Sequence, residues 1–358
     1  MTASRTVIFG ALLALAGCAA WEPDVGYYWQ SASGHLALLA RARPIDDLVA
    51  DPSIEPRLKS RLLLAREIRA FAATELALPD NGSYTRYVDV GAPSVVWNVF
   101  ATAELSLELR RWCFPVAGCV AYRGYFDRQA AERAAESLRA EGLEAFVAGI
   151  PAYSTLGWFD DPVLSTFLHA PDGDLARMIF HELAHQLVYL RGDTTFNESF
   201  ATAVEQEGLR RWLALRGDPA LERAVNESAA RRRQFVALLL RHRAVLEAVY
   251  REGGSVETMR SRKAQTFESL RQEYAELKTA WGGYTGFDRW FGPGLTNAHL
   301  ASVSAYHTLV PAFERRLAAQ DGDLTRFYAD VRALARMSPD ARRRALEDAS
   351  GPIAGLPR

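Results

Sequence analysis

Residues 174–201 read DLARMIFHELAHQLVYLRGDTTFNESFA and predict two helices joined by a short loop. Asp174 can cap the start of the first helix, and Gly192 can end it in the left-handed conformation. Apolar residues recur along this helix at helical spacing; they are Leu175, Met178, Ile179, Leu183, Leu187 and Leu190. A helix this apolar is expected to be mostly buried, so its polar side chains need partners.

The first helix carries the pattern HExxH at residues 181–185. His181 and His185 lie one turn apart on the same face, so both imidazoles can reach one cation at about 2.0–2.1 Å, as in zinc sites. Glu182 lies beside them, where its carboxylate can act as general base toward a water molecule on the metal. The alternative is a core helix whose two histidines bond to backbone or carboxylate groups.

The second helix supplies the expected third ligand. Glu198 follows His185 by 13 residues, and the loop at 191–195 lets the second helix fold back antiparallel and bring this carboxylate to the metal. Water would take the fourth, open position. Glu205, two turns further on, is a candidate to orient a ligand histidine. Asp193 and Glu205 are rival third ligands, and the alternative for Glu198 is an ordinary acid in a first helical turn.

The rest of the chain predicts an α+β fold, in which a small mixed sheet with helices is followed by a mainly helical C-terminal half. Strand patterns occupy 84–90, 94–102 and 144–150, and upstream helical patterns occupy 57–78 and 127–141. Further helical patterns cover about 175–190, 197–215, 218–251, 255–280, 296–319 and 322–336.

The composition is that of an ordinary globular protein. Of 358 residues, 49% are apolar and 24% are charged, which excludes a disordered, collagenous or coiled-coil chain. Lys and Arg number 42 and Asp and Glu 43, so no basic excess indicates nucleic acid as a partner. Three cysteines are too few for a small fold built on disulfides. Nothing in the sequence indicates an oligomeric state.

The N-terminus predicts export and lipid attachment. Residues 1–17 place Arg5 before an apolar run that is shorter than the roughly 20 residues of a membrane span, and they are typical of a signal peptide. The run ends in Leu-Ala-Gly before Cys18, which resembles the bacterial lipobox, where the cysteine thiol carries a lipid. Ala19 resembles the outer-membrane sorting pattern, so we expect a lipid anchor on the periplasmic face of that membrane, with 18–26 as a tether. The alternative is an ordinary secretory signal with an incidental cysteine.

Cys113 and Cys119 are expected to form a disulfide in an oxidising compartment. They enclose Phe-Pro-Val-Ala-Gly, a turn-prone loop able to bring the two Cβ atoms together. So short a loop would stabilise the fold by roughly 2 kcal/mol. Two free buried thiols are the alternative. Zinc is not expected there, because no histidine or second cysteine pair lies nearby in the sequence.

The motifs HELAH at 181–185 and NESFA at 197–201 resemble those of the gluzincin metallopeptidases, which combine HExxH with a glutamate from a following helix. More closely, the chain resembles the bacterial predicted-aminopeptidase lipoprotein family over nearly the whole mature length. The stretches that carry this resemblance are the lipobox, Cys113–Cys119, Tyr122–Phe126, Tyr153–Phe159 and Asp193–Ala201.

This resemblance implies a zinc peptidase with a peptide substrate. Its Zn²⁺ ligands would be His181, His185 and Glu198, and its catalytic base would be Glu182, which takes a proton from water and delivers it to the leaving amine. Residues 27–215 would form a zincin-like catalytic region, with small sheet and active-site helices. Residues 216–352 would form a helical region packed on it.

Such a site usually has a second oxyanion donor. The candidates are Tyr153, Tyr284, Tyr306 and His307, and we favour Tyr306 as a catalytic residue because 297–307 is polar and aromatic within a plain helical half. A tyrosine packed in the core with a bonded hydroxyl is the alternative. The strand near 144–153 could offer an edge to an extended peptide.

Other conspicuous residues receive an unremarkable interpretation. The arginine-rich runs at 231–233 and 241–243 are expected to be solvated helix faces, with contact to anionic lipid headgroups as the alternative. No role is expected for His35, His169 or His299.

Two rival functions share the predicted metal site. One is a non-catalytic zinc-binding lipoprotein that acts as a binding or assembly module. The other is a metal-dependent hydrolase of non-peptide envelope material. A purely structural zinc site does not need Glu182 or an open coordination position, so the residues favour the peptidase.

Overall fold

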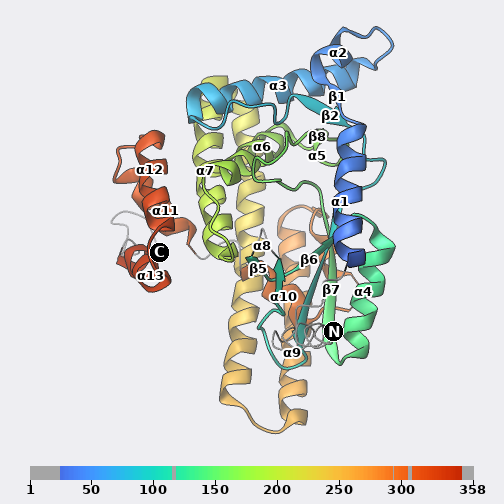
Figure 1. The fold of residues 1–358 in the computed structure, drawn as a ribbon. Helices are drawn as coiled ribbons and strands as arrows, with labels where there is room; N and C mark the ends of the chain where they lie inside the picture. Colours follow the sequence, from blue (N-terminus) through green and yellow to red (C-terminus); the bar gives the residue numbers. More distant parts are fainter. Residues whose placement is uncertain (1–24, 115–117, 293, 305–308, 349–358) are drawn as a thin grey trace, which may run out of the picture.

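The computed structural model describes residues 25–114, 118–292, 294–304 and 309–348 (Figure 1). Its helices are α1 (Val25–Ala40), α2 (Ile45–Ala50), α3 (Pro56–Leu76), α4 (Arg128–Ala140), α5 (Ser165–Leu168), α6 (Asp172–Leu187), α7 (Thr194–Arg216), α8 (Pro219–Glu252), α9 (Val256–Ala280), the 3-10 helix η1 (Asp288–Phe291), α10 (Asn297–Ser304), α11 (Val310–Ala318), α12 (Leu324–Ala335) and α13 (Pro339–Asp348). Its strands are β1 (Arg43–Pro44), β2 (Arg86–Val88), β3 (Val96–Ala103), β4 (Trp112–Phe114), β5 (Gly118–Val120), β6 (Arg123–Tyr125), β7 (Leu143–Ile150) and β8 (Val163–Leu164). The α+β class with a helical C-terminal half is therefore confirmed.

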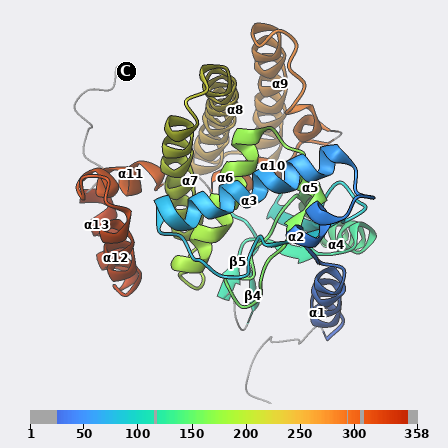
Figure 2. The same cartoon turned by 90° about the horizontal axis from the view of Figure 1, so that it is seen from above.

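Helices α6 and α7 pack tightly against each other and form the middle of the main core. The two helices cross. In Figure 1 α7 runs vertically, and Figure 2, which looks down that vertical, shows α6 lengthwise. The expectation that they run antiparallel along their lengths is therefore wrong. Gly208 of α7 makes the close approach possible. A Cβ there would lie 2.8 Å from the Phe180 ring of α6 and 2.7 Å from Leu76 of α3.

The loop between α6 and α7 is fixed by side chains that bond to its backbone. The Asn197 amide donates to the Leu190 carbonyl at 2.9 Å and accepts from the Leu190 N–H at 2.7 Å. Asp193 caps α7 by accepting from the Phe196 N–H at 3.0 Å. These bonds satisfy polar backbone groups that the turn would otherwise leave without partners, and they hold the start of α7 close to the end of α6.

A three-stranded antiparallel sheet in the order β6-β3-β7 lies below the helix pair in Figure 1. Side chains alternate along β3, so Val99 and Phe100 point to opposite faces. Val99 belongs to a small core with alanines of α4, while Phe100 lies beside Phe146, which stacks on His299 of α10 at 3.8 Å. Helices α4 and α10 therefore cover the two faces of the sheet.

Strands β4 and β5 form a hairpin closed by a disulfide between Cys113 and Cys119, as the sequence predicted. The hairpin lies against the loop between α6 and α7. A Cβ at Gly118 would lie 2.8 Å from the Gly192 backbone nitrogen, and Arg111 donates to both the Cys119 carbonyl at 2.7 Å and the Gly192 carbonyl at 3.0 Å. The disulfide thus supports a segment that borders the two central helices.

Several boundaries differ from the sequence-based expectations. Asp174 does not cap α6, which starts at Asp172 after Pro171, so both acids lie in the first turn, where the helix dipole favours them. Gly192 is left-handed (φ +80°), but α6 already ends at Leu187, since Val188 is extended. Helix α1 was not expected, and α10 and α11 are the described parts of the pattern at 296–319.

Two further points concern surfaces. In the run at 241–243, His242 is buried and bonded to Glu273 of α9 at 3.0 Å, so this residue makes a helix contact, whereas Arg241 is exposed as expected. Among the residues that the structure describes, no helix has both the length and the apolar character to cross a membrane.

Removing the disulfide should destabilise the protein by about 2 kcal/mol, because the loop that it closes in the unfolded chain is short. We expect this loss for the double variant Cys113→Ser/Cys119→Ser, measured by urea unfolding under oxidising conditions. Wild-type protein kept in reductant should show the same loss. A double variant as stable as the oxidised wild type would contradict the prediction.

Candidate metal centre

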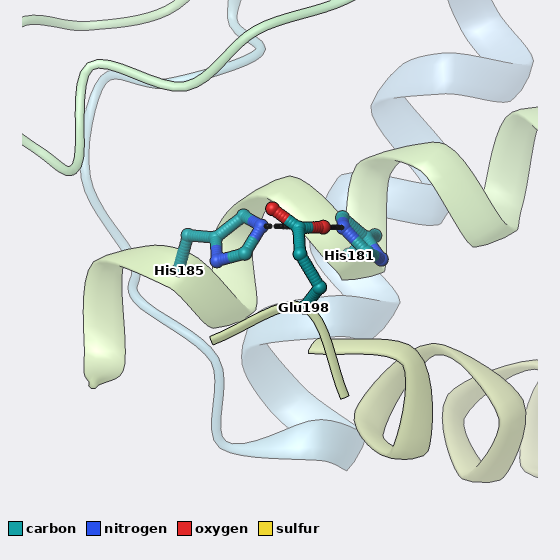
Figure 3. Close-up of side chains that lie close together, drawn as sticks. All are labelled: His181, His185 and Glu198. Carbon is teal, nitrogen blue, oxygen red and sulfur yellow. Dashed lines mark hydrogen bonds and ion pairs between the residues drawn. The ribbon is translucent and has the colours of Figure 1, made fainter. Parts of the chain in front are cut away.

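Three side chains from α6 and α7 point at one another and form the candidate metal centre (Figure 3). The Nε2 atoms of His181 and His185 lie 3.2 Å apart, and Glu198 Oε2 lies 3.2 Å from the first and 3.8 Å from the second. The histidines come from one face of α6, and the carboxylate comes from a residue near the start of α7, just after its first turn. Residues 181, 185 and 198 are thus brought together as the sequence led us to expect.

The spacing of these atoms fits a divalent cation. Two ligands held about 2.0–2.1 Å from a tetrahedral ion lie about 3.3 Å from each other. The observed separations of 3.2, 3.2 and 3.8 Å are close to that value. Two imidazoles and one carboxylate form a common donor set for zinc at catalytic sites. His181, His185 and Glu198 can therefore hold a metal ion without rearrangement of the helices.

Glu205 lies behind His181, on the side away from the other two ligands. His181 Nδ1 donates to Glu205 Oε2 at 2.8 Å, and Arg177 donates to Glu205 Oε1 at 2.6 Å through Nη2. Burial opposes ionisation of Glu205, but the bonds from His181 and the charge of Arg177 outweigh it and hold its pKa at about 2. Glu205 is thus an anion that fixes the ring orientation of His181.

The charges around the site favour a cation. Burial opposes protonation of His181, but its hydrogen bonds to Glu198 and Glu205 raise its pKa well above the ordinary value. Burial lowers the pKa of His185 to about 4. Its buried Nδ1 has no hydrogen-bond partner among the described residues. The carboxylates thus favour one positive charge at this point, which either a proton on His181 or a bound metal ion can supply, while the His185 ring stays neutral and able to act as a ligand.

Glu182 is a second buried carboxylate beside the three ligands. It is 8% exposed, and burial raises its pKa to about 7, with Glu198 and Asp161 acting in the same direction and His181 acting against them. A carboxylate whose pKa lies near neutrality can both accept and return a proton at that pH. The environment of Glu182 therefore suits a general base.

The ligands line a pocket of about 730 Å³ between α6 and the sheet. Aromatic side chains form much of its wall; they are Tyr27, Phe114, Tyr122, Phe126, Tyr153, Phe159 and Tyr189. The end of β7 and the following residues 150–156 also line it, so the predicted edge at 144–153 borders the site. Towards the start of α6, charged side chains take over, namely Asp174, Arg177 and Arg232.

The remaining predicted site residues lie in different places. Tyr153 lines the pocket, but its hydroxyl is bonded to His35 Nδ1 at 2.6 Å. Tyr284 is an exposed residue beside Trp281 and Phe287 and is not among the described pocket-lining residues. Tyr306 and His307 lie outside the described residues. Asp193, a rival ligand, caps α7 and pairs with Arg342 at 3.2 Å.

Sequence reasoning missed several pocket residues. His35, given no role, reaches the pocket from α1 and packs edge-on against Phe159. Tyr122 and Tyr189 present hydroxyls near Glu198; burial raises the pKa of each, and the Glu198 charge adds to the effect. Arg177 could have been found, because it lies one turn before His181 on the same face of α6.

Asp161 anchors the loop between β7 and β8 near Glu182. Its carboxylate accepts from the Thr155 N–H at 2.9 Å and the Thr155 hydroxyl at 2.8 Å, and its side chain is almost fully buried. Burial dominates over these bonds and raises its pKa to about 6. In the folded protein Asp161 therefore keeps its proton up to a higher pH than an ordinary aspartate does.

Asp161 should make stability depend on pH. Its pKa is about 6 in the folded protein against an ordinary value of 3.8, so between these values only the folded state keeps the proton. The free energy of unfolding should fall as pH rises through this window, by about 3 kcal/mol in total. Asp161→Asn should lack this fall. Urea titrations of both proteins from about pH 4 to 7 measure it, and a constant difference between them would contradict the prediction.

One comparison with known proteins identifies a family for this chain. No curated protein and no solved structure gave a match. A family model described as "Putative aminopeptidase" matches residues 26–346, a range that includes the pocket and all three candidate ligands. Since this match covers most of the chain, the protein belongs to the Putative aminopeptidase family.

Proposed function

We propose that this protein is a zinc-dependent peptidase, of the gluzincin type and with a zincin-like catalytic region, that removes residues from the N-termini of peptides. The observation that carries the proposal is the convergence of His181 Nε2, His185 Nε2 and Glu198 Oε2 beside Glu182 in an open pocket. The family name supports peptidase activity, and the HExxH pattern with a downstream glutamate supports zinc and the gluzincin type.

His181, His185 and Glu198 would hold the zinc ion. When bound, zinc makes water a stronger nucleophile at neutral pH and polarises a peptide carbonyl. Glu205 keeps His181 in the tautomer that leaves Nε2 free to be a ligand, because Nδ1 carries the proton that Glu205 accepts. Arg177 in turn keeps Glu205 ionised and in place.

Glu182 moves the proton in this mechanism. One of its carboxylate oxygens takes a proton from the attacking water and returns it to the nitrogen of the leaving amine. Both transfers need a carboxyl group whose pKa lies close to the working pH, and burial raises that of Glu182 to about 7. Glu182 is buried, so bulk water has little access to this carboxylate.

A second donor toward the developing oxyanion is still a prediction. Tyr306 is the residue that the sequence favours. Within the described part of the chain, Tyr122 and Tyr189 offer hydroxyls in the pocket near Glu198. Tyr153 also lines the pocket, where its hydroxyl is bonded to His35.

The non-catalytic alternative is a zinc-binding module without turnover. The position of Glu182 speaks against it, because an ion held only for structure does not need a further buried carboxylate in the pocket beside its ligands. A non-peptide substrate would use the same ligands and the same base. The pocket wall alone distinguishes these substrates, and its many aromatic side chains suit apolar peptide side chains.

The cellular location belongs to the same proposal. A lipid on Cys18 would anchor the protein to the bacterial cell envelope, on the periplasmic face of the outer membrane. Helix α1 begins seven residues after Cys18, contains no charged residue, and leaves Trp29 and Leu36 exposed by 75% and 58%. An uncharged helix with an exposed tryptophan suits a position near a membrane surface. Nucleic acid is not an expected partner.

Glu182→Gln should abolish turnover and leave the metal in place, because the amide cannot accept the proton. We expect a loss of at least about 100-fold in kcat with unchanged zinc content, and chelation should silence the wild type in a way that added zinc reverses. Cleavage of a mixed peptide library, read by mass spectrometry, is the measurement. The exposed Glu247→Gln is the control. Internal cuts would refute the aminopeptidase assignment, and an active Glu182→Gln would refute the role of Glu182.

Glu205→Gln should weaken zinc binding about 10- to 100-fold, because the anion that orients His181 is lost. The matched control is Glu207→Gln, since Glu207 lies on the same helix and pairs with Arg210 and Arg211 away from the pocket. Competition with a chromogenic chelator measures both affinities. Equal affinities in the two variants would mean that Glu205 does not support the ligand.

A further inference from the structure

The three consecutive arginines at 231–233 lie in different environments on α8. Arg231 pairs with Glu227 at 3.5 Å and lies 5.0 Å above the Tyr284 ring. Arg233 is exposed. Arg232 lines the pocket that holds the candidate metal ligands. Arg232 is exposed, as expected for a solvated face, but it also borders the pocket, which the sequence did not predict.

The close approach of α8 to the start of α6 places Arg232 there. A Cβ on Gly173 of α6 would lie 2.4 Å from Val225 of α8, so only glycine permits this contact. Arg232 follows Val225 by seven residues, which is two helical turns, and therefore points from the same side of α8. Its position in the pocket wall thus follows from the packing of the two helices.

The positive charge of Arg232 is only partly balanced. Its Nη2 lies 3.9 Å from Asp174 Oδ1, and the same oxygen lies 3.6 Å from Nη1 of Arg177. One carboxylate thus serves two guanidinium groups at distances too long for good hydrogen bonds. Partial burial and the charge of Arg177 lower the pKa of Arg232, as expected for a cation beside another cation. Its side chain is 49% exposed, so an anion in the pocket can reach it.

The distance between Arg232 and the metal ligands can be estimated from the rise of helix α6. Asp174, next to Arg232, and His181 are seven residues apart on α6, and a helix rises about 1.5 Å per residue, so they are about 10 Å apart. An extended peptide advances about 3.3 Å per residue. An anionic group that reached Arg232 would therefore lie about two or three residues from the carbonyl at the metal.

We propose that Arg232 binds the C-terminal carboxylate of short peptide substrates, two or three residues beyond the bond that is cleaved. The planar guanidinium matches a carboxylate and can donate two parallel hydrogen bonds to it. The substrates would then be tri- and tetrapeptides with a free C-terminus, held at one end by Arg232 and at the other by the metal centre. This inference rests on the proposed peptidase function and adds the substrate class to it.

An acidic side chain at the same distance offers the same chemistry, so the experiment uses three probes. They are a tetrapeptide of phenylalanine followed by three alanines, its C-terminal amide, and an amide in which the third residue is aspartate. Binding of each probe to zinc-loaded Glu182→Gln is measured by calorimetry, and kcat and KM are measured on the active enzyme. Calorimetry reads the carboxylate contact without any turnover.

We expect the free acid to bind about 10- to 100-fold more tightly than its amide, as a charge-assisted hydrogen bond would give. Arg232→Gln should remove this difference by raising KM for the acid alone, with kcat little changed. Arg232→Lys should keep part of it, and Arg233→Gln, the matched control one residue away, should keep all of it. If the aspartate amide also binds tightly and loses this in Arg232→Gln, the anion site is supported with an acidic side chain as a second source.

Equal binding of all three probes, or an acid preference that survives in Arg232→Gln, would overturn the inference. Either result is compatible with zinc-dependent cleavage. If wild-type protein cleaves no peptide at all, the proposed function fails. The two failures are therefore separate observations.

Discussion

The approach of the start of α7 to one face of α6 is the contact on which the site depends. His181 and His185 alone would be two imidazoles on a buried helix, and the carboxylate of Glu198 gives them a common point. The hydrogen bonds between the Asn197 amide and the Leu190 backbone fix this approach, and the disulfide hairpin contacts the same loop. Local hydrogen bonds in a turn thus set the geometry of a centre built from two helices.

The neighbouring carboxylates Glu205 and Glu182 are both buried, but they differ in their partners. Glu205, bonded to His181 and Arg177, has a pKa of about 2 and is a fixed anion. No arginine acts on Glu182 among the described residues, and burial raises its pKa to about 7. Two glutamates on crossing helices therefore differ by about five pKa units because of their partners. This contrast separates a group that orients from a group that can exchange a proton.

The sequence predicted those parts of the molecule that have strong local signals. HExxH places two side chains on one helix face whatever the tertiary structure, and the patterns for β3 and β7 are long and apolar. Helix α1 escaped notice because it has no charged residue and hence little contrast between its faces. The pocket position of Arg232 could not be predicted, since three identical neighbours differ only in how α8 packs on α6.

Helix α6 carries Asp174, Arg177, His181 and His185 along one side of the pocket. Each residue added to or deleted from a helix turns everything beyond it by about 100°. A single insertion between 177 and 181 would therefore rotate the two ends of this row onto different faces. The pocket therefore cannot be lengthened or shortened on this side by inserting or deleting single residues of α6 during evolution. Variation among relatives is accordingly expected on the facing wall, in the loop at 151–162 and in α1, where added residues leave the row intact.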